Sequence, residues 1–209
     1  MTRRNGLSRR RPFRRASPRI LIVCEGKKTE PGYFAYFRKR YRGVLEIKLK
    51  SGDAPRALVD LAVKLKTDAD RAANATQDPN LLFDEVWCVF DVDGRKVASA
   101  KRHAVENGIQ AAISNPCFEL WALLHFQDQR AQISATKLKE ACRKYMPGYE
   151  KELPTARLEQ FYDKALANAR SLDAWQRQQG RGPDENPSTG VYRLTEAIKS
   201  HASAPGIIR

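Results

Sequence analysis

Acidic residues follow two apolar segments of this sequence at the points where the segments end. Glu25 comes directly after residues 20–24, and Asp91 and Asp93 come directly after residues 86–90. Residues two apart in an extended chain face the same side, so the two Asp carboxylates are expected to lie together. Carboxylates that approach one another repel unless a cation neutralises them, and hard oxygen ligands suit Mg²⁺ or Mn²⁺. The spacing favours a divalent-cation site, with a turn capped by acids as the alternative.

A further acid, Glu119, lies within the strongly apolar segment 118–124. A buried carboxylate is costly unless it is bound or hydrogen-bonded. If Asn115 caps a helix that begins at Pro116, Glu119 lies about one turn into that helix, directed towards the strand ends. Two interpretations of Glu119 stay open: a ligand or base in a functional site, or a structural cap or ion pair.

Basic residues flank the acids, namely Lys27, Lys28 and Arg95. They could hold a scissile phosphate or stabilise negative charge that develops in a transition state, and solvated loop residues are the alternative. The sequence contains no G-x-x-x-x-G-K-[ST] pattern, so nucleotide hydrolysis by this chain is not expected. No histidine belongs to a nucleophile-and-base pattern, so triad chemistry is not expected either.

The elements that must position these residues alternate between strand and helix. Apolar or alternating runs predict strands over residues 20–24, 44–50, 86–90 and 109–113. The spacing of apolar residues predicts helices over residues 33–41, 55–73, 96–106, 118–126, 136–145, 155–178 and 189–201. This order predicts an α/β fold with a mostly parallel sheet flanked by helices, followed by a helical C-terminal part without strands.

The chain has 209 residues, with 38 Lys and Arg against 24 Asp and Glu and a formal net charge of +14. Eight arginines lie within residues 1–19, which hold no acid. Such an arm attracts phosphates regardless of sequence, and a poorly ordered, solubilising terminus is the alternative. No run is long and apolar enough to span a bilayer, and no secretory signal is expected. The scattered cysteines favour a reducing cytoplasm over a disulfide or zinc framework.

Several segments in order resemble the RloB-like family of bacterial phage-defence and abortive-infection proteins, a branch of the Toprim domain. The resemblance lies in Cys24–Phe34 (CEGKKTEPGYF), Phe90–Asp93 (FDVD), Ser114–Phe126 (SNPCFELWALLHF) and Asn186–Thr189 (NPST). It covers nearly the whole chain except the arm. It implies a Toprim-like core over residues 20–128 and a helical extension over residues 129–209 that packs on the core.

The resemblance also implies site residues. Glu25 matches the Toprim glutamate, a general acid/base or metal ligand, and Asp91 and Asp93 match the metal-binding pair. Glu30 matches a second acid of the pattern, although an acid at a helix N-terminus is stabilised by the helix dipole without any metal. Glu25, from this resemblance, and Glu119, from its place in an apolar helix, are the candidate catalytic residues. The candidate metal ligands are Glu25, Glu30, Asp91 and Asp93.

We expect a Mg²⁺- or Mn²⁺-dependent, nuclease-like protein that hydrolyses phosphodiester bonds in DNA or RNA during phage defence. The resemblance implies a companion ATPase as partner, and the sequence leaves a homo-oligomer open. The alternative function is a non-catalytic nucleic-acid-binding or sensor subunit of a defence complex, in which the acids hold a structural metal.

Overall fold

The structure is a computed structural model that describes residues 18–41, 45–49, 54–94, 96–150 and 152–203. The arm predicted over residues 1–19 lies almost entirely outside this range, and Arg95 lies outside it as well. Their expected roles in phosphate binding therefore remain predictions.

The strands of the described residues are β1 (Ile20–Cys24), β2 (Leu45–Leu49), β3 (Glu85–Asp91), β4 (Gln110–Asn115) and β5 (Ser188–Thr189). They form one sheet in the order β2-β1-β3-β4-β5. Strands β1 to β4 are parallel to their neighbours, and β5 pairs antiparallel with β4. The α/β fold with a mostly parallel sheet flanked by helices, which the sequence predicts, is confirmed.

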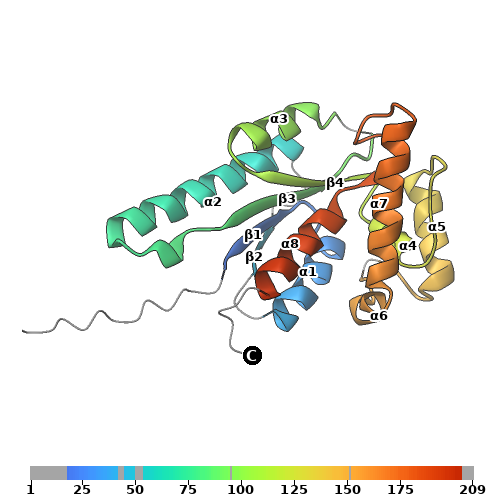
Figure 1. Ribbon diagram of the computed structural model, residues 1–209, viewed down its shortest axis with the longest axis horizontal. Helices are drawn as coiled ribbons and strands as arrows, with labels where there is room; N and C mark the ends of the chain where they lie inside the picture. Colours follow the sequence, from blue (N-terminus) through green and yellow to red (C-terminus); the bar gives the residue numbers. More distant parts are fainter. Residues whose placement is uncertain (1–17, 42–44, 50–53, 95, 151, 204–209) are drawn as a thin grey trace, which may run out of the picture.

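The helices are α1 (Thr29–Arg40), α2 (Pro55–Thr76), α3 (Ala98–Glu106), α4 (Glu119–Leu124), α5 (Ala135–Tyr145), α6 (Thr155–Glu159), α7 (Tyr162–Gln178) and α8 (Val191–Ser203), with a short 3₁₀ helix at Pro79–Leu81. Figure 1 shows α2 and α3 on one face of the sheet and α1 and α8 on the other. Helices α4, α5, α6 and α7 gather beyond one end of the sheet (Figure 1).

The sheet is buried on both faces, as the continuous apolar run of β1 predicts. Every residue of β1 is 0% exposed. Side chains alternate across a strand, so Ile22 and Cys24 join one apolar cluster, whereas Leu21 and Val23 join the other. The first cluster is covered by α1 and the C-terminal helices, and the second by α2 and α3. The sheet is therefore the middle layer of three.

The start of α4 differs from the prediction. The helix begins at Glu119 rather than Pro116, and Asn115 ends β4 and donates a hydrogen bond to Asp184 O instead of capping a helix. The amides of Val92 and Asp93 donate to Ser114 O and Pro116 O, which continues the pairing with β3 past the last strand residue. This pairing delays the helix, and Glu119 lies at its first turn.

Two further differences concern the C-terminal part. The helix predicted over residues 155–178 is interrupted at Gln160 and Phe161, although Leu158 and Tyr162 on either side are both buried. The apolar period therefore continues across the break and gives no signal of it. The prediction that no strand follows Pro116 is wrong, because the two-residue β5 pairs with β4.

Candidate functional site

Glu25 and Asp91 lie at the carboxyl ends of two neighbouring parallel strands, β1 and β3. The amide of Glu25 donates to Val89 O at 3.1 Å, so the pairing of the strands continues to the first acid. Both side chains are half-buried. Ligands of open α/β sheets bind outside the carboxyl ends of strands, so these acids lie where the fold places its sites.

Glu30 enters the same region from the first turn of α1. Its residue is only 5% exposed. Burial raises its pKa most, the nearby charges of Glu119 and Glu25 raise it further, and hydrogen bonds from backbone N–H groups, including that of Gly26, oppose the rise. A Cβ built on Gly26 would lie 1.9 Å from Glu30 Oε2. A side chain at this position would therefore displace the carboxylate.

Glu119 is also buried, at 6% exposed, and has polar partners. The hydroxyl of Tyr149 donates to Glu119 Oε1 at 2.8 Å, and Lys139 Nζ lies 3.8 Å from the same oxygen. Burial and Glu119 together raise the pKa of Tyr149, which keeps its proton and remains a donor. Both interpretations of Glu119 from the sequence stay open, because Glu119 has an ion-pair partner and also lines a cavity.

The acids form one electrostatic group although they come from separate segments. Glu30 is coupled to both Glu25 and Glu119. The thiol of Cys117 connects this group to β3, because its pKa is raised first by burial and then by Glu119 and Asp91. Glu25 and Glu119 thus lie within electrostatic reach of Glu30, and Asp91 lies within reach of Cys117.

Asp93 is placed differently from the expectation. Its φ is 38° and that of Gly94 is 74°, so the chain leaves the extended conformation directly after β3. The argument that Asp91 and Asp93 share a side applies only to an extended chain, and it fails at this turn. Asp93 is exposed, whereas Asp91 is half-buried. A metal role for Asp93 stays a prediction.

A cavity of about 490 Å³ opens beside the buried acids. Glu30 and Glu119 line it together with Lys27 and Lys28, the basic residues that the sequence analysis associates with phosphate. Lys139 and Arg143 of α5 and Glu150 also border it. Sequence reasoning missed these α5 residues, because their positions beside buried Leu138 and Cys142 look like the ordinary polar flank of an amphipathic helix.

The donor chemistry of this group suits a hard divalent cation. Carboxylate oxygens are the ligands that Mg²⁺ and Mn²⁺ prefer, and a cation would relieve the repulsion that adds to burial in raising the pKa of Glu30. Within the part of the chain that the structure describes, however, no three His, Cys, Asp or Glu side chains are arranged so that they could already hold a metal ion. The metal ligands therefore remain a prediction.

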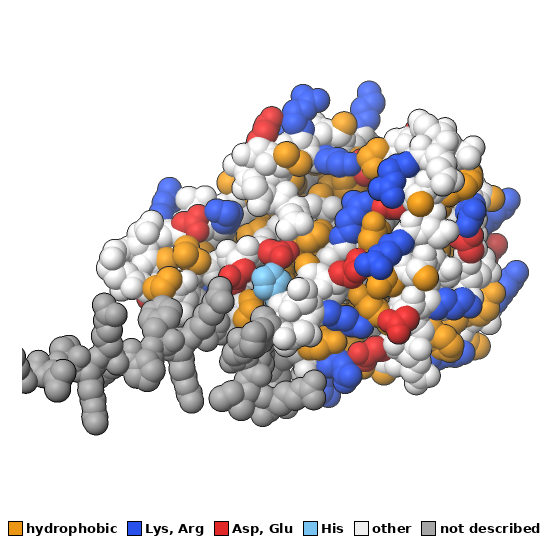
Figure 2. All heavy atoms as spheres, viewed as in Figure 1, with side chains coloured by type: hydrophobic (Ala, Val, Ile, Leu, Met, Phe, Trp, Pro, Cys, Tyr) orange, Lys and Arg blue, Asp and Glu red, His pale blue; other side chains and the backbone are white. Residues whose placement is uncertain are grey.

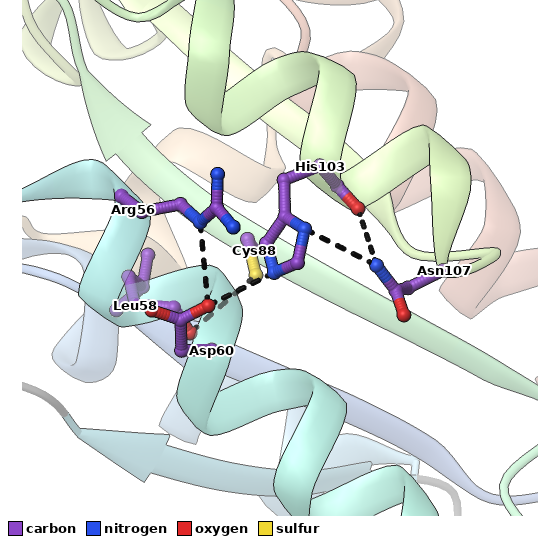
Figure 3. A network of polar contacts seen from close by, with 6 residues as sticks. All are labelled: Arg56, Leu58, Asp60, Cys88, His103 and Asn107. Atoms are coloured by element: carbon purple, nitrogen blue, oxygen red, sulfur yellow. Dashed lines mark hydrogen bonds and ion pairs between the residues drawn. The ribbon is translucent and has the colours of Figure 1, made fainter.

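The histidines take structural positions away from this cavity. His103 Nε2 lies 2.9 Å from Asp60 Oδ1, and Asn107 contacts the same ring, so this network joins α3 to α2 (Figure 3). His201 contacts Glu85 at the start of β3. His125 is 0% exposed, and its Nδ1 lies 2.8 Å from a backbone carbonyl oxygen. Each histidine therefore has a contact that joins it to a neighbouring element or to the backbone.

The outer surface of α7 and α8 mixes charges of both signs. Figure 2 shows Lys and Arg side chains next to acidic ones over this face. Arg170 pairs with Glu196, and Arg193 pairs with Asp173, so each of these arginines is neutralised by an acid of the other helix. This face is therefore a weaker candidate for binding phosphates than the cavity, where several basic side chains lie close together.

The protein is of the open α/β class, with acids at the carboxyl ends of β1 and β3, the edge at which such sheets bind ligands. The family model of RloB-like proteins matches residues 20–198, and the chain belongs to this family. Searches of curated proteins and of solved structures found no significant match. Among the described residues, no helix has the length and apolar character needed to cross a membrane.

Proposed function

We propose that this protein is a nuclease-like enzyme that hydrolyses phosphodiester bonds in DNA or RNA with Mg²⁺ or Mn²⁺. We further propose that it acts in the cytoplasm in bacterial phage defence, together with a companion ATPase. Membership in the RloB-like family supports the defence role and the partner. The acids and basic residues at the cavity support phosphodiester hydrolysis as the reaction.

One observation carries the chemical part of the proposal. Glu25, Glu30 and Glu119 come from separate segments and are electrostatically coupled beside a cavity that basic residues also line. Glu30 and Glu119 are buried, and burying like charges is costly unless they are bound or paired. Acids that could hold a cation and bases that could hold a phosphate are the two requirements of metal-assisted phosphodiester hydrolysis.

Different residues of this chain would carry out proton transfer, positioning and phosphate binding. A bound divalent cation would supply a water of lowered pKa and would neutralise charge on the phosphate. Glu25 and Glu119 are the candidates to hold or move a proton, and Tyr149 and Lys139 keep Glu119 in place. Lys27 and Lys28, at the rim of the cavity, would attract and orient the phosphate.

The first experiment tests cleavage by the full chain with Mn²⁺ or Mg²⁺ and labelled RNA, single-stranded DNA or plasmid. We expect cleavage of at least one substrate. Glu25→Gln and Asp91→Asn keep the side-chain shape but remove charge, so cleavage should fall by about a hundredfold to ten-thousandfold. Asp68→Asn, an exposed acid on α2, is the matched control and should cleave normally.

Phage protection in cells separates the two functional hypotheses. Loss of protection in the Asp91→Asn, Asp93→Asn double variant, together with loss of cleavage in vitro, supports the enzyme. Full protection by that variant rejects the nuclease hypothesis and favours a non-catalytic subunit.

Binding of a divalent cation can be tested without an assay of cleavage. A cation that binds only the folded state raises the melting temperature by mass action, so Mn²⁺ should stabilise the full chain. Glu30→Gln removes one of the repelling charges and should reduce the response. A wild-type melting curve that millimolar Mn²⁺ leaves unmoved contradicts the metal site.

A further inference from the structure

Lys139 and Arg143 lie on one side of α5, because residues four apart face the same way on a helix. Both line the cavity beside the buried acids, and Lys28 lines it from the loop between β1 and α1. The basic residues of this cavity therefore come from two segments that are far apart in the sequence. Neither α5 residue is buried in the core, whose α5 members are Leu138 and Cys142.

The contacts of these two residues leave them available to a ligand. Lys139 Nζ lies 3.8 Å from Glu119 Oε1, which is close enough for attraction but too far for a hydrogen bond, and its side chain is 44% exposed. Arg143 donates from Nε to Tyr149 O at 3.4 Å. This contact uses one of the five N–H donors of a guanidinium.

We propose that Lys139 and Arg143 bind a backbone phosphate of the nucleic acid and hold it in the cavity that Lys28 also lines. This inference rests on the proposed function and adds the residues that hold the substrate. The cavity of about 490 Å³ is within the range of roughly 300–1,000 Å³ that small-ligand sites occupy, so it has room for a phosphate and its nucleoside. The recessed acids repel a phosphate, and the cations of α5 offset that repulsion.

Binding of a fluorescein-labelled single-stranded oligonucleotide to the full chain, at several KCl concentrations and with EDTA present, tests this inference. Lys139→Met and Arg143→Met keep an apolar stem and remove the charge. Each phosphate contact that is lost should flatten the slope of log K against log[salt] by about 0.7. The matched controls, Lys137→Met and Lys144→Met, change exposed lysines of the same helix that do not line the cavity.

A purely structural role of Lys139 is tested in a second background. If Lys139 acted only by neutralising Glu119, then Glu119→Gln would cancel the effect of Lys139→Met. Phosphate binding predicts that the slope still flattens by about 0.7 in the Glu119→Gln protein. Arg143→Met, which does not remove the ion pair of Glu119, provides a variant that is expected to fold.

The outcomes separate this inference from the proposed function. Flattened slopes in the α5 variants support the inference, even if no variant and no wild-type protein cleaves nucleic acid. Slopes of the α5 variants equal to those of Lys137→Met and Lys144→Met overturn it, even if the wild type is an active nuclease. A wild-type protein that does not bind the oligonucleotide also overturns it.

Discussion

The two faces of the sheet are built from the same strands, but their interiors differ in chemistry. On the face covered by α2 and α3, the packed residues form an apolar cluster that includes Leu21, Val23 and Phe90. On the opposite face, the apolar cluster of α1, α4, α5, α7 and α8 shares its interior with buried Glu119 and His125. Neighbouring residues of one strand thus face two different environments.

Several polar groups of the second face have partners that offset their burial, whereas Nε2 of His125 is buried without one. Trp121 Nε1 donates to Tyr33 Oη at 2.8 Å, and Tyr162 Oη donates to Thr195 Oγ1 at 3.1 Å. A buried polar group without such a partner costs about 1–3 kcal/mol. The comparison teaches that the α2 and α3 face contributes mainly hydrophobic stability, whereas the other face also contains buried polar groups, of which Glu119 borders the cavity.

The largest expected effect on stability belongs to the apolar face. Phe90 is 0% exposed, and Phe90→Ala removes a large buried ring, so the free energy of unfolding should fall by about 3–5 kcal/mol. Chemical denaturation measures the change. Val105→Ala, at a position that is 71% exposed on α3, is the control and should change stability by less than about 0.5 kcal/mol. A small effect of Phe90→Ala would contradict the conclusion that the α2 and α3 face contributes mainly hydrophobic stability.

The next effect is a pH dependence from the polar face. Burial lowers the pKa of His125 to about 4. The unfolded chain binds a proton at this residue as the pH falls below about 6.5, but the folded chain does so only near pH 4. Stability should therefore fall with decreasing pH across this window, by about 3 kcal/mol at 1.36 kcal/mol for each pKa unit.

The variant His125→Phe isolates this contribution, because its side chain cannot titrate. We expect the stability difference between wild type and His125→Phe to change by about 3 kcal/mol across the window, as measured by urea unfolding. Glu30 acts in the opposite direction, because its raised pKa lets the folded state bind a proton first as the pH falls. A pH-independent difference would show that His125 is not buried as a neutral group.

A smaller effect concerns the partner of Glu119. Tyr149→Phe removes the hydroxyl that donates to Glu119 Oε1, and a hydrogen bond to a charged group contributes about 1.5–3 kcal/mol. The control is Tyr145→Phe, whose hydroxyl donates to the neutral Gln127 Oε1 at 2.9 Å and should cost about 0.5–1.5 kcal/mol. Equal losses in thermal or chemical unfolding would mean that Glu119 does not depend on Tyr149.

The smallest effect on stability should accompany a loss of function. The three atoms nearest to a Cβ at position 26 all belong to the carboxylate end of Glu30, so Gly26→Ala should move that carboxylate while the fold stays intact. We expect at least a tenfold loss of cleavage, which corresponds to about 1.4 kcal/mol of transition-state stabilisation.

Gly32→Ala is the control for this variant. A Cβ at position 32 meets no atom within 4 Å, and alanine favours a helix interior over glycine by about 0.5–1 kcal/mol. This protein should be slightly more stable and equally active. Equal cleavage by Gly26→Ala and Gly32→Ala would show that the position of the Glu30 carboxylate does not matter for activity.

Much of the fold could be predicted from local patterns. The continuous apolar run 20–24 predicts a strand buried on both faces, and β1 forms there. The amphipathic pattern after Pro55 predicts a helix buried on one side, and α2 forms there. The placement of Glu25 and Asp91 after buried strands also follows from the sequence, because parallel strands bring their carboxyl ends to one edge. Local hydrophobic periodicity and the geometry of parallel strands were sufficient for these conclusions.

Tertiary structure alone decided the rest of the site. No local pattern distinguishes Lys139 from any polar residue beside the buried face of α5, and no pattern pairs Tyr149 with Glu119. The burial of Glu30 against Gly26 likewise depends on where α1 begins relative to β1. Sequence periodicity determines which side of an element is buried, whereas the partners of a polar side chain depend on how distant segments pack, because contacts between them leave no periodic signal.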